Sequence, residues 1–593
     1  MSLAQREVGQ SPAADDPGPR ARKGATWLVL GCYLLGSLVL TWHLWASPAT
    51  MVQLGNISDV DLFAWFMHYD AAAVAHGHLP ALVTTALNYP RGVNLMWNTS
   101  FLLPGIVLAP LTLLAGPQVS LTVMLALGFA GSAAALFWVL RRWGASVAAA
   151  AVGGAVYGFS PALMTAGLSH YHLQFAVLPP LIVDALLRIV TGRGSAVKNG
   201  VWLGVLVAAQ VFTGEELLVI TAVAGGVLAG LVWLTGWRAT RERVPGTAAG
   251  LAVAGGVAIL LSGYALYIQF LGPLHEHGSP WKPGRFINYL PAFVLPPGNL
   301  LFHTPASAAY AASDPVGTTE YLAYLGLPLL LVLLAALIVC WRDRKVRLTA
   351  LTFALLEAFT LGGSAVPLAG WHYPGKLLPW HWLAKLPVLS QVLPDRFSLL
   401  AAGAAAAALA FSFDLARRAV AGGAWWRRGI PAAVAAMAVL PLVPLPLQAA
   451  APAAVPAGWQ AAFTRLHLPD SAPVLIVPIP WGHASQGMRW QAETGMPGAM
   501  NAGYFIGPNK NGQAKAYGTG RIRSVATLVD GLWAGTPAGP DAVTTGKLRT
   551  GIAYWRPAAV VAVTTRGSRI GRILITLLGQ PSFQTGQLLV WRR

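Results

Sequence analysis

Long apolar runs separated by short polar loops occupy most of the first 450 residues of the chain. The first run extends from Ala25 to Trp45, and a helix needs about 20 apolar residues to cross a bilayer. We therefore expect a mostly α, polytopic membrane helix bundle of about eleven spans. The further spans are expected near 119–140, 146–160, 175–190, 200–213, 217–236, 247–269, 322–341, 348–364, 397–416 and 429–448.

The polar segments set the domain boundaries. Residues 1–24 are rich in Pro and polar types, which predicts a disordered cytoplasmic N-terminus. The membrane domain is expected at 25–449, with an unusually long first outer loop at 46–118, inside which 101–115 is apolar but too short to span. A C-terminal α/β domain is expected at 450–593. Its predicted strands are 473–479, 558–564 and 587–592, and its predicted helices are 521–532 and 568–578.

Composition supports the membrane class and excludes several others. Hydrophobic types make up 55% of the chain and charged types 10%, whereas soluble domains carry roughly 25% charged residues. The net charge of +19 would suggest nucleic acid in a soluble protein. Here, loops predicted inside hold 20 Lys and Arg, and outer loops before residue 450 hold six. This asymmetry follows the positive-inside rule and predicts a plasma-membrane protein with a cytoplasmic N-terminus, an extracytoplasmic C-terminal domain and no nucleic-acid partner.

The long first outer loop carries two acids that are close in sequence. Asp59 and Asp61 lie two residues apart beside the membrane, where they can accept a proton from an acceptor hydroxyl or hold a divalent cation such as Mg, Mn or Ca. The same residues fit a helix start, with Ser58 and Asp61 as a capping box. Three more residues of the loop are candidates for lining a cavity, or are simply solvated: Asp70, His76 and His78.

Polar residues also gather at the outer ends of later spans. His170 and His172 can hydrogen-bond a sugar or phosphate, or anchor the interface, and Glu215 and Glu216 can line a cavity or form a solvated hairpin tip. Arg396 can bind phosphate or only pair with Asp395. The outer loops near 270–321 and 365–396 add aromatic and basic residues that suit a sugar-phosphate site or an aromatic belt: Arg285, Trp371, His372 and Lys376.

Seven stretches of the sequence resemble the GT-C fold of membrane glycosyltransferases, and in particular multispanning GT-C-like proteins of actinobacteria. They are Asp61–Phe66, Asn88–Ser100, Gly158–Pro161, Ser169–Phe175, Leu393–Phe397, Arg489–Met496 and Gly503–Phe505. The resemblance implies an extracytoplasmic transfer of sugar from a polyprenyl-phosphate donor to a glycan, lipid or protein acceptor, in one inverting displacement. It also implies a base in the first outer loop, a role for which Asp59, Asp61 and Asp70 compete. Asp61 leads, and Asp59 is a helper or metal ligand.

Two other functions remain open at this point. One is a lipid or sugar transporter or flippase, and the other is a non-catalytic cell-envelope assembly protein. The enzyme is favoured if Asp59 or Asp61 meets His170, His172 and Arg396 in one outward cavity, and disfavoured if these residues scatter. The sequence has no nucleotide-binding loop, zinc helix or nucleophile elbow of the common kinds.

Overall fold

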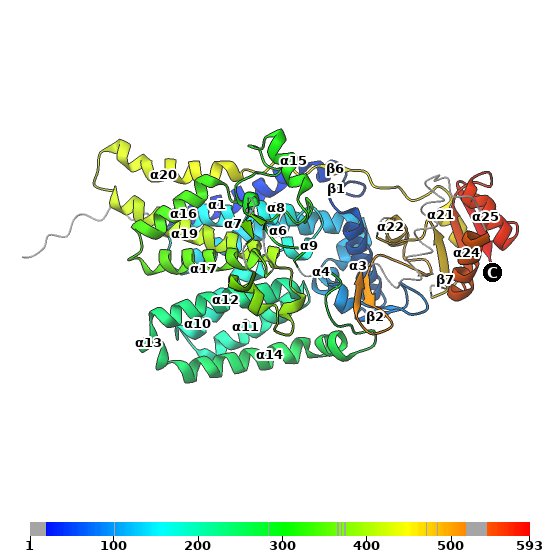
Figure 1. The fold of residues 1–593 in the computed structure, drawn as a ribbon, viewed down its shortest axis with the longest axis horizontal. Helices are drawn as coiled ribbons and strands as arrows, with labels where there is room; N and C mark the ends of the chain where they lie inside the picture. The colour runs from blue at the N-terminus through cyan, green and yellow to red at the C-terminus, as the bar shows by residue number, and fades with distance from the viewer. Residues whose placement is uncertain are drawn as a thin grey trace, which may run out of the picture.

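The computed structural model describes residues 19–99, 101–282, 284–363, 367–368, 371–372, 375–469, 471–482, 484–516 and 542–593. The described part is elongated (Figure 1). A bundle of long helices fills one end, a smaller unit with a β-sheet fills the other, and helix α3 lies between them.

Each of the eleven predicted spans coincides with a helix or a pair of helices. Six helices are long and apolar enough to cross a membrane among the residues described, and α11 and α16 are shorter apolar helices. The chain is therefore a multi-pass membrane protein, while the number of crossings stays a prediction. The bundle helices are α1 (Pro19–Leu40), α6 (Pro117–Arg142), α7 (Val147–Gly158) with α8 (Pro161–Ala166), α10 (Leu178–Val190), α11 (Ala196–Val211), α12 (Glu215–Thr235), α14 (Val244–Leu271), α16 (Leu327–Val339), α17 (Arg344–Thr360), α19 (Ser398–Ala419) and α20 (Trp425–Val439).

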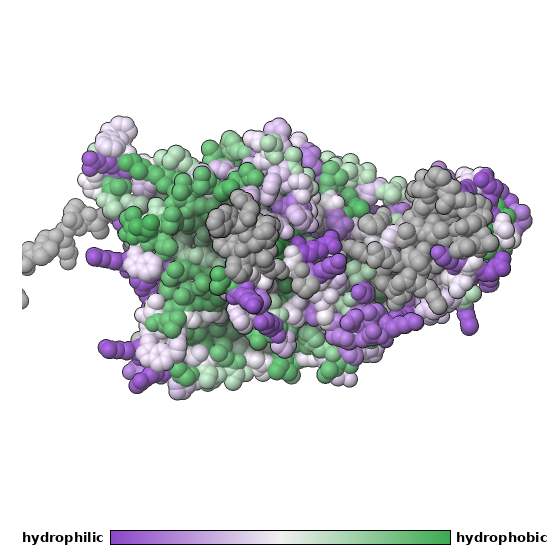
Figure 2. Space-filling view, viewed as in Figure 1, coloured by the Kyte–Doolittle hydropathy of each residue, from purple (hydrophilic) through white to green (hydrophobic). Residues whose placement is uncertain are grey.

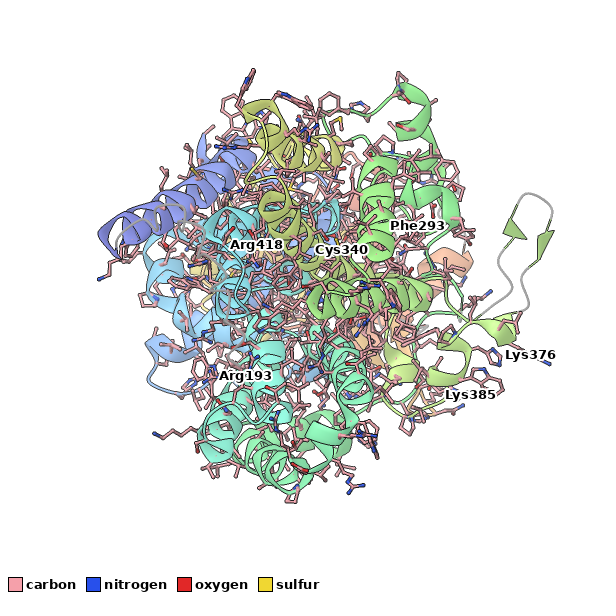
Figure 3. The ribbon with its side chains drawn as sticks, turned by 90° about the vertical axis from the view of Figure 1, so that its left-hand side faces the viewer. Arg193, Phe293, Cys340, Lys376, Lys385 and Arg418 are labelled. Carbon is pink, nitrogen blue, oxygen red and sulfur yellow. The ribbon has the colours of Figure 1, made fainter. Side chains whose placement is uncertain are left out.

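Apolar side chains cover much of the flank of the bundle, as Figure 2 shows in green. On α14, Ile259 is 67% exposed and Leu260 83% exposed. Exposed apolar surface of this extent is a liability in water and is normal against lipid. Figure 3 looks onto the end of the bundle remote from the sheet, which is predicted to be cytoplasmic; Arg193 lies there in a loop and Arg418 in the last turn of α19.

Small residues bring α11 and α14 into close contact. A Cβ added at Gly200 would lie 2.5 Å from the carbonyl oxygen of Gly250, and one at Gly204 would lie 2.6 Å from that of Ala254. Glycine four residues apart on one helix lets two backbones approach, which is a common way to pack helices in a membrane. The two helices form one wall of the cavity described below.

The first outer loop is ordered around α3 (Ile57–Ala75). Asn56 caps this helix by accepting a hydrogen bond from the Ser58 backbone N–H, so the predicted capping box of Ser58 and Asp61 is wrong. The 101–115 stretch forms two helices too short to span, as expected. The elements of this loop are α2 (Trp42–Trp45), β1 (Val52–Gln53), α3, β2 (Val83–Thr84), β3 (Val93–Asn94), η1 (Leu95–Asn98), α4 (Leu102–Val107) and α5 (Ala109–Ala115).

Short elements connect the remaining bundle helices. β6 pairs antiparallel with β1, so the chain leaving the last bundle helix returns to the start of the first outer loop. These elements are α9 (Tyr171–Gln174), α13 (Trp237–Arg241), η2 (Leu290–Phe293), α15 (Pro305–Ser313), β4 (Pro367–Leu368), β5 (Trp371–His372), η3 (Gly375–Leu377), α18 (Trp380–Leu383), η4 (Leu389–Gln391), η5 (Pro394–Phe397), η6 (Leu440–Leu442) and β6 (Ala449–Ala450).

The C-terminal unit is built on a five-stranded mixed sheet of order β12-β13-β11-β7-β8. β11 runs parallel to β7 and antiparallel to β13. The predicted strands and the helix near 568–578 are present, and the predicted helix 521–532 lies outside the described residues. The elements are α21 (Trp459–Leu466), β7 (Pro473–Val477), α22 (Gln486–Glu493), β8 (Ala499–Met500), β9 (Ile506–Pro508), β10 (Ala514–Ala516), α24 (Ala542–Trp555), β11 (Ala559–Val563), α25 (Arg569–Leu578), β12 (Phe583–Thr585) and β13 (Leu588–Arg592).

The two faces of this sheet pack differently. Leu475 and Val560 contribute to a cluster that also contains residues of α24 and α25. Val474 and Val561, which point to the other face, belong to the cluster that includes Trp65 of α3 and the bundle. The unit thus has a core of its own on one side and shares a core with α3 on the other.

Candidate active site

A cavity of about 640 Å³ lies where the bundle, α3 and the C-terminal unit meet. Among its lining residues are seven that the sequence predicted: Asp59, His170, His172, Glu215, Glu216, Arg285 and Arg396. The convergence of Asp59 with both histidines and Arg396 is the arrangement that favours an enzyme over the alternatives.

Asp59 stands at the polar end of the cavity, in the first turn of α3. One carboxylate oxygen accepts a hydrogen bond from the Tyr504 hydroxyl at 2.7 Å, and the other accepts from the Asn56 amide at 2.7 Å. Burial raises the pKa of Asp59 to about 6, against the lowering effect of the Tyr504 hydrogen bond. A carboxylate with this pKa is largely ionised at neutral pH and is still able to take up a proton.

Arg396, on η5, lines the cavity and is held by two acids. Its Nε contacts a Glu320 carboxylate oxygen at 3.3 Å, and its two terminal nitrogens form ion pairs with Glu320 and Glu216. Asp395, which we expected to hold this guanidinium, is fully buried, and neither of its carboxylate oxygens has a hydrogen-bond partner among the described residues. Glu216 and Glu320 therefore take the role predicted for Asp395.

His170 joins Asp59 to the Arg396 cluster. Its Nε2 lies 3.5 Å from a carboxylate oxygen of Asp59 and 3.5 Å from one of Glu320. Burial, with a smaller effect of Arg396, lowers the pKa of His170 well below its usual value. The ring is therefore neutral at neutral pH, and its contacts with the two carboxylates are polar contacts rather than ion pairs.

Arg285 supplies the second guanidinium of the cavity wall. Its Cζ lies 5.3 Å from the ring centroids of both Trp281 and Phe286, which also line the cavity. These rings hold the cation by cation–π attraction and leave it without a carboxylate ion pair among the described residues. Arg285 is thus available to an anionic ligand.

Apolar side chains of α11, α12 and α14 form the other end of the cavity, which we call the apolar arm. α14 is mostly exposed on its outer side, so the arm adjoins the lipid-facing surface. The lining residues of the arm are Val207, Val211, Leu218, Val219, Ala258, Ile259, Ser262 and Leu266.

Asp61, the leading base candidate from the sequence, lies outside the cavity. It is 1% exposed and accepts hydrogen bonds from the Arg489 Nε at 2.6 Å and the Ser485 hydroxyl at 2.7 Å. Residues two apart on a helix project roughly 200° from each other, so Asp59 and Asp61 point to opposite sides of α3. They do not form a joint metal site, and the described residues contain no group of three His, Cys, Asp or Glu that could hold a metal ion.

Several other predicted residues lie away from the cavity. Asp70 is buried next to Gly105, and burial raises the pKa of its carboxyl well above the usual value. His76 and His78 are exposed beyond the end of α3. Lys376 is exposed and projects from the flank of the bundle in Figure 3. The side chains of Trp371 and His372 lie outside the described part of the structure.

Three residues of the site had no prediction: Asn56, Glu320 and Tyr504 all line the cavity. Glu320 stands alone in a loop, and no sequence spacing connects it with Arg396. Tyr504 lies within Gly503–Phe505, one of the stretches that resemble GT-C proteins. This resemblance was the only indication in the sequence that Tyr504 could belong to the site.

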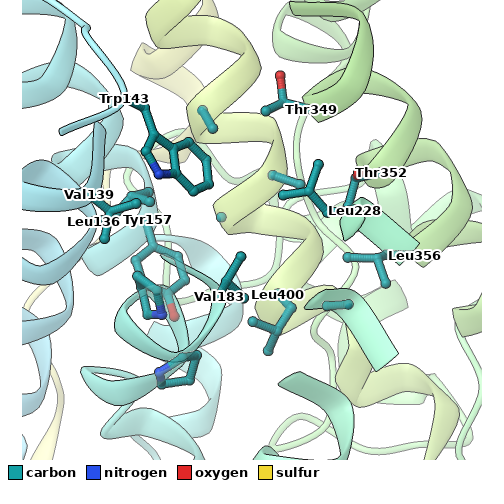
Figure 4. A pocket seen from close by; sticks show the side chains of 16 residues that line it. Leu136, Val139, Trp143, Tyr157, Val183, Leu228, Thr349, Thr352, Leu356 and Leu400 are labelled. Carbon is teal, nitrogen blue, oxygen red and sulfur yellow. The ribbon is translucent and has the colours of Figure 1, made fainter. Parts of the chain in front are cut away.

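A second, smaller cavity lies deeper in the bundle (Figure 4). Its lining is apolar except for a few hydroxyl and indole groups, and it includes Trp143, Tyr157, Leu228, Thr352 and Leu400. Its lining residues include no charged side chain, so it offers neither a counter-charge to a phosphate nor a carboxylate base, and we place the chemistry in the larger cavity.

Comparisons with known proteins gave matches to solved structures only. No protein-family model matches the chain, and no curated protein matches it. The chain is similar to the Archaeoglobus fulgidus oligosaccharyltransferase in its apo form, with 13% identity over 90% of this chain and 69% of that chain and a TM-score of 0.48. It is similar to the arabinofuranosyltransferase AftD from Mycobacteria, with 16% identity over 93% of this chain and 37% of that chain and a TM-score of 0.47.

ArnT from Cupriavidus metallidurans, solved with undecaprenyl phosphate bound, is a third similar structure. The identity is 13% over 96% of this chain and 98% of that chain, and the TM-score is 0.43. The names of the first two proteins are glycosyltransferase names, the class that the sequence motifs resemble. At identities and TM-scores this low, the function of this chain has to be inferred from its own cavity.

Proposed function

We propose that this protein is a membrane glycosyltransferase that moves a sugar from a polyprenyl-phosphate donor to a cell-envelope acceptor on the outer face of the membrane. The observation that carries the proposal is a single cavity with the Asp59 carboxylate, three glutamates and two guanidinium groups among its polar lining residues, and with the apolar arm at its other end. A donor of this kind has a charged head and a hydrocarbon tail, and the cavity offers matching surroundings for both.

Asp59 is the general base in this proposal, in place of Asp61. It faces the cavity and its pKa of about 6 suits proton transfer near neutral pH. Asp61 is neutralised by Arg489 and shielded from the cavity, so it has no access to an acceptor hydroxyl.

Arg396 and Arg285 bind the donor phosphate. A guanidinium can grip two phosphate oxygens at once. Because Glu216 and Glu320 already occupy Arg396, an arriving phosphate has to take the place of at least one carboxylate contact. Arg285, which contacts two aromatic rings and has no carboxylate ion pair among the described residues, adds a positive charge without such a rearrangement.

The reaction is a single displacement at the anomeric carbon. The acceptor oxygen forms the new glycosidic bond as its proton passes to Asp59, and the bond from the anomeric carbon to the phosphate oxygen breaks with its electron pair going to the phosphate. The phosphate gains one negative charge, which Arg396 and Arg285 stabilise. Attack from the side opposite the leaving group inverts the anomeric configuration.

The acids inside the bundle speak against a transporter. Asp184 contacts Arg142 and the indole of Trp143, each at 2.9 Å. Glu357 is hydrogen-bonded separately to hydroxyl groups, which include Ser398 at 3.3 Å. These two sites do not join into a polar path from one side of the bundle to the other, which a flippase or ion-coupled transporter requires.

Binding of undecaprenyl phosphate tests the proposal directly. Full-length protein in lipid nanodiscs is expected to retain undecaprenyl phosphate in native mass spectrometry and to bind undecaprenol, which lacks the phosphate, at least about ten-fold more weakly. The same preparation is then supplied with polyprenyl-phosphate sugars, and release of the lipid phosphate is followed. Equal binding of both lipids, or no release from any donor, would contradict the proposal.

Substitutions of Arg396 should distinguish bidentate hydrogen bonding to the phosphate from the effect of a positive charge alone. Arg396→Ala is expected to weaken binding of undecaprenyl phosphate by about 10- to 100-fold, because a charge-assisted bidentate contact is lost. Arg396→Lys keeps the positive charge but not the planar guanidinium, so its affinity for undecaprenyl phosphate should lie between those of the wild type and Arg396→Ala. Arg193→Ala, in the distant loop, serves as the control, and unchanged binding by Arg396→Ala would remove Arg396 from the donor site.

The orientation of the chain can be checked by thiol labelling. In a background without Cys32 and Cys340, a membrane-impermeant maleimide applied to intact cells is expected to label Gln587→Cys in the C-terminal unit. Ala421→Cys, in the basic loop between α19 and α20, should react only after the cells are opened. The reverse pattern would overturn the predicted topology. Both positions are exposed in the structure, so failure to react reports the side of the membrane.

A further inference from the structure

The loop that carries Tyr504 belongs to the C-terminal unit but is fixed to the first outer loop. The Met500 backbone N–H donates to the Ala86 carbonyl at 2.9 Å, and the Tyr89 backbone N–H donates to the Met500 carbonyl at 2.9 Å. On the other side of Tyr504, the Asn98 side chain exchanges hydrogen bonds with the backbone of Ile506, at 2.6 and 2.9 Å. Residue 504 is therefore held between two sets of hydrogen bonds.

Close packing leaves this loop no room to shift. A Cβ added at Gly503 would lie 2.4 Å from a methyl carbon of Leu87, so only glycine allows the loop to approach the first outer loop this closely. Met500 lies in β8, at the edge of the five-stranded sheet. The position of the Tyr504 hydroxyl is thus set by both the sheet and the first outer loop.

The Tyr504 hydroxyl donates to Asp59 on the side of the carboxylate that Asn56 and His170 leave free. Asn56 and His170 both lie against the second carboxylate oxygen, at 2.7 and 3.5 Å, while Tyr504 contacts the first at 2.7 Å. The carboxylate plane is fixed when both oxygens are held. Without Tyr504, only one oxygen would keep a partner among the described residues.

We propose that Tyr504 is a positioning residue for Asp59, through which the C-terminal unit completes the catalytic cavity of the membrane domain. The inference rests on the proposed role of Asp59 as the base. It assigns the C-terminal unit a direct part in the reaction, since a phenol on its loop orients the carboxylate toward the acceptor and keeps it in the ionised form. Tyr504 itself neither bonds to nor exchanges a proton with the substrate.

Other charged groups around Asp59 also affect its pKa, which Glu320 raises and Arg396 lowers. His170 faces it from the loop before α9, Glu320 and Arg396 act through space from the loop before α16 and from η5, and Glu216 of α12 is paired with Arg396. None of these groups changes when the Tyr504 hydroxyl is removed. A hydrogen bond to the ionised form of an acid lowers its pKa, so loss of the hydroxyl raises the pKa of Asp59 above about 6.

Carbodiimide labelling tests this without any substrate, since a water-soluble carbodiimide reacts with protonated carboxyl groups. Full-length protein is labelled across a pH series, and modification at Asp59 is read by peptide mass spectrometry. Tyr504→Phe is expected to move the labelling midpoint up by about one pH unit. A ring-fluorinated tyrosine at position 504, which is a stronger donor, should move it down. Tyr554→Phe, on α24 of the same unit, should leave it unchanged.

A labelling midpoint that is the same in wild type, Tyr504→Phe and the fluorinated variant would overturn the proposal. Transfer assays add a second reading: Tyr504→Phe should lower kcat by about ten-fold at neutral pH, with the acid limb displaced upward and KM for the donor unchanged. If Tyr504→Phe shifts the labelling midpoint but wild-type protein transfers no sugar, the proposed function fails while the positioning contact stands.

Discussion

Replacing Asp59 with Asn is expected to lower the rate of sugar transfer by about 10²- to 10⁴-fold, the range typical of a lost general base. Asn has the shape of Asp and still offers one oxygen to the Tyr504 hydroxyl, so the fold should persist although the hydrogen bond from Asn56 is lost. What it lacks is the ability to accept a proton. Initial transfer rates and the thermal unfolding temperature of the same purified samples separate the two properties.

The same assignment fixes the pH dependence of the wild-type enzyme. The base works in its ionised form, so kcat/KM should rise with pH through the pKa of Asp59, near 6, and level off above it. Glu242→Gln is the control, because it changes an exposed acid between α13 and α14 that does not line the cavity. Transfer by Asp59→Asn at the wild-type rate, or an acid limb unaffected in that variant, would exclude Asp59 as the base.

The helices of the bundle could be predicted because their signal is local. Each span is a run of apolar residues, and the apolar pattern alone placed helices such as α6 and α19 close to their observed positions. The strands β7 and β11 were found for the same reason, since short apolar runs between turn residues indicate buried strands. Boundaries at shorter helices such as α16 depend on contacts that the pattern does not contain.

The structure separates the two acids that the sequence analysis had paired. Asp59 and Asp61 were treated as a pair because they are close in sequence, but α3 turns them to opposite sides. Recognising that helix from Asn56 onward would have assigned one acid to each side. Asp61 is on the side of α3 that packs against Arg489, a residue more than 400 positions away in the sequence. Asp59 is left on the side that faces the cavity. No spacing in the sequence carries that information.

The cavity itself combines residues from distant parts of the chain. Asp59, His170, Glu320 and Arg396 come from four segments, and the contact of His170 with both acids exists only after the bundle and α3 have assembled. Residue type and predicted side of the membrane were enough to nominate His170 and Arg396. They were not enough to select Glu320 over Asp395 as the partner of Arg396.

Replacing Arg489 with Leu is expected to lower the free energy of unfolding by about 3–5 kcal/mol, the cost typical of breaking a buried ion pair by removing one partner. Arg489 and Asp61 are each 1% exposed, and the contact between them joins α22 of the C-terminal unit to α3. Without the guanidinium, the Asp61 carboxylate is left buried without its counter-charge. Thermal unfolding in detergent, followed by intrinsic fluorescence, gives the change in stability.

The double variant Asp61→Leu/Arg489→Leu identifies the origin of this loss. Removing both charges leaves no unpaired ion, so the double variant should be more stable than the sum of the two single losses predicts, by more than about 1 kcal/mol. Arg549→Leu, at an exposed position of α24, should change stability by less than about 0.5 kcal/mol. Additive losses would mean that the ion pair does not couple α22 to α3. Since Asp59 begins the same helix, loss of this coupling should also lower transfer in Arg489→Leu protein that remains folded, whereas the exposed control should keep its activity.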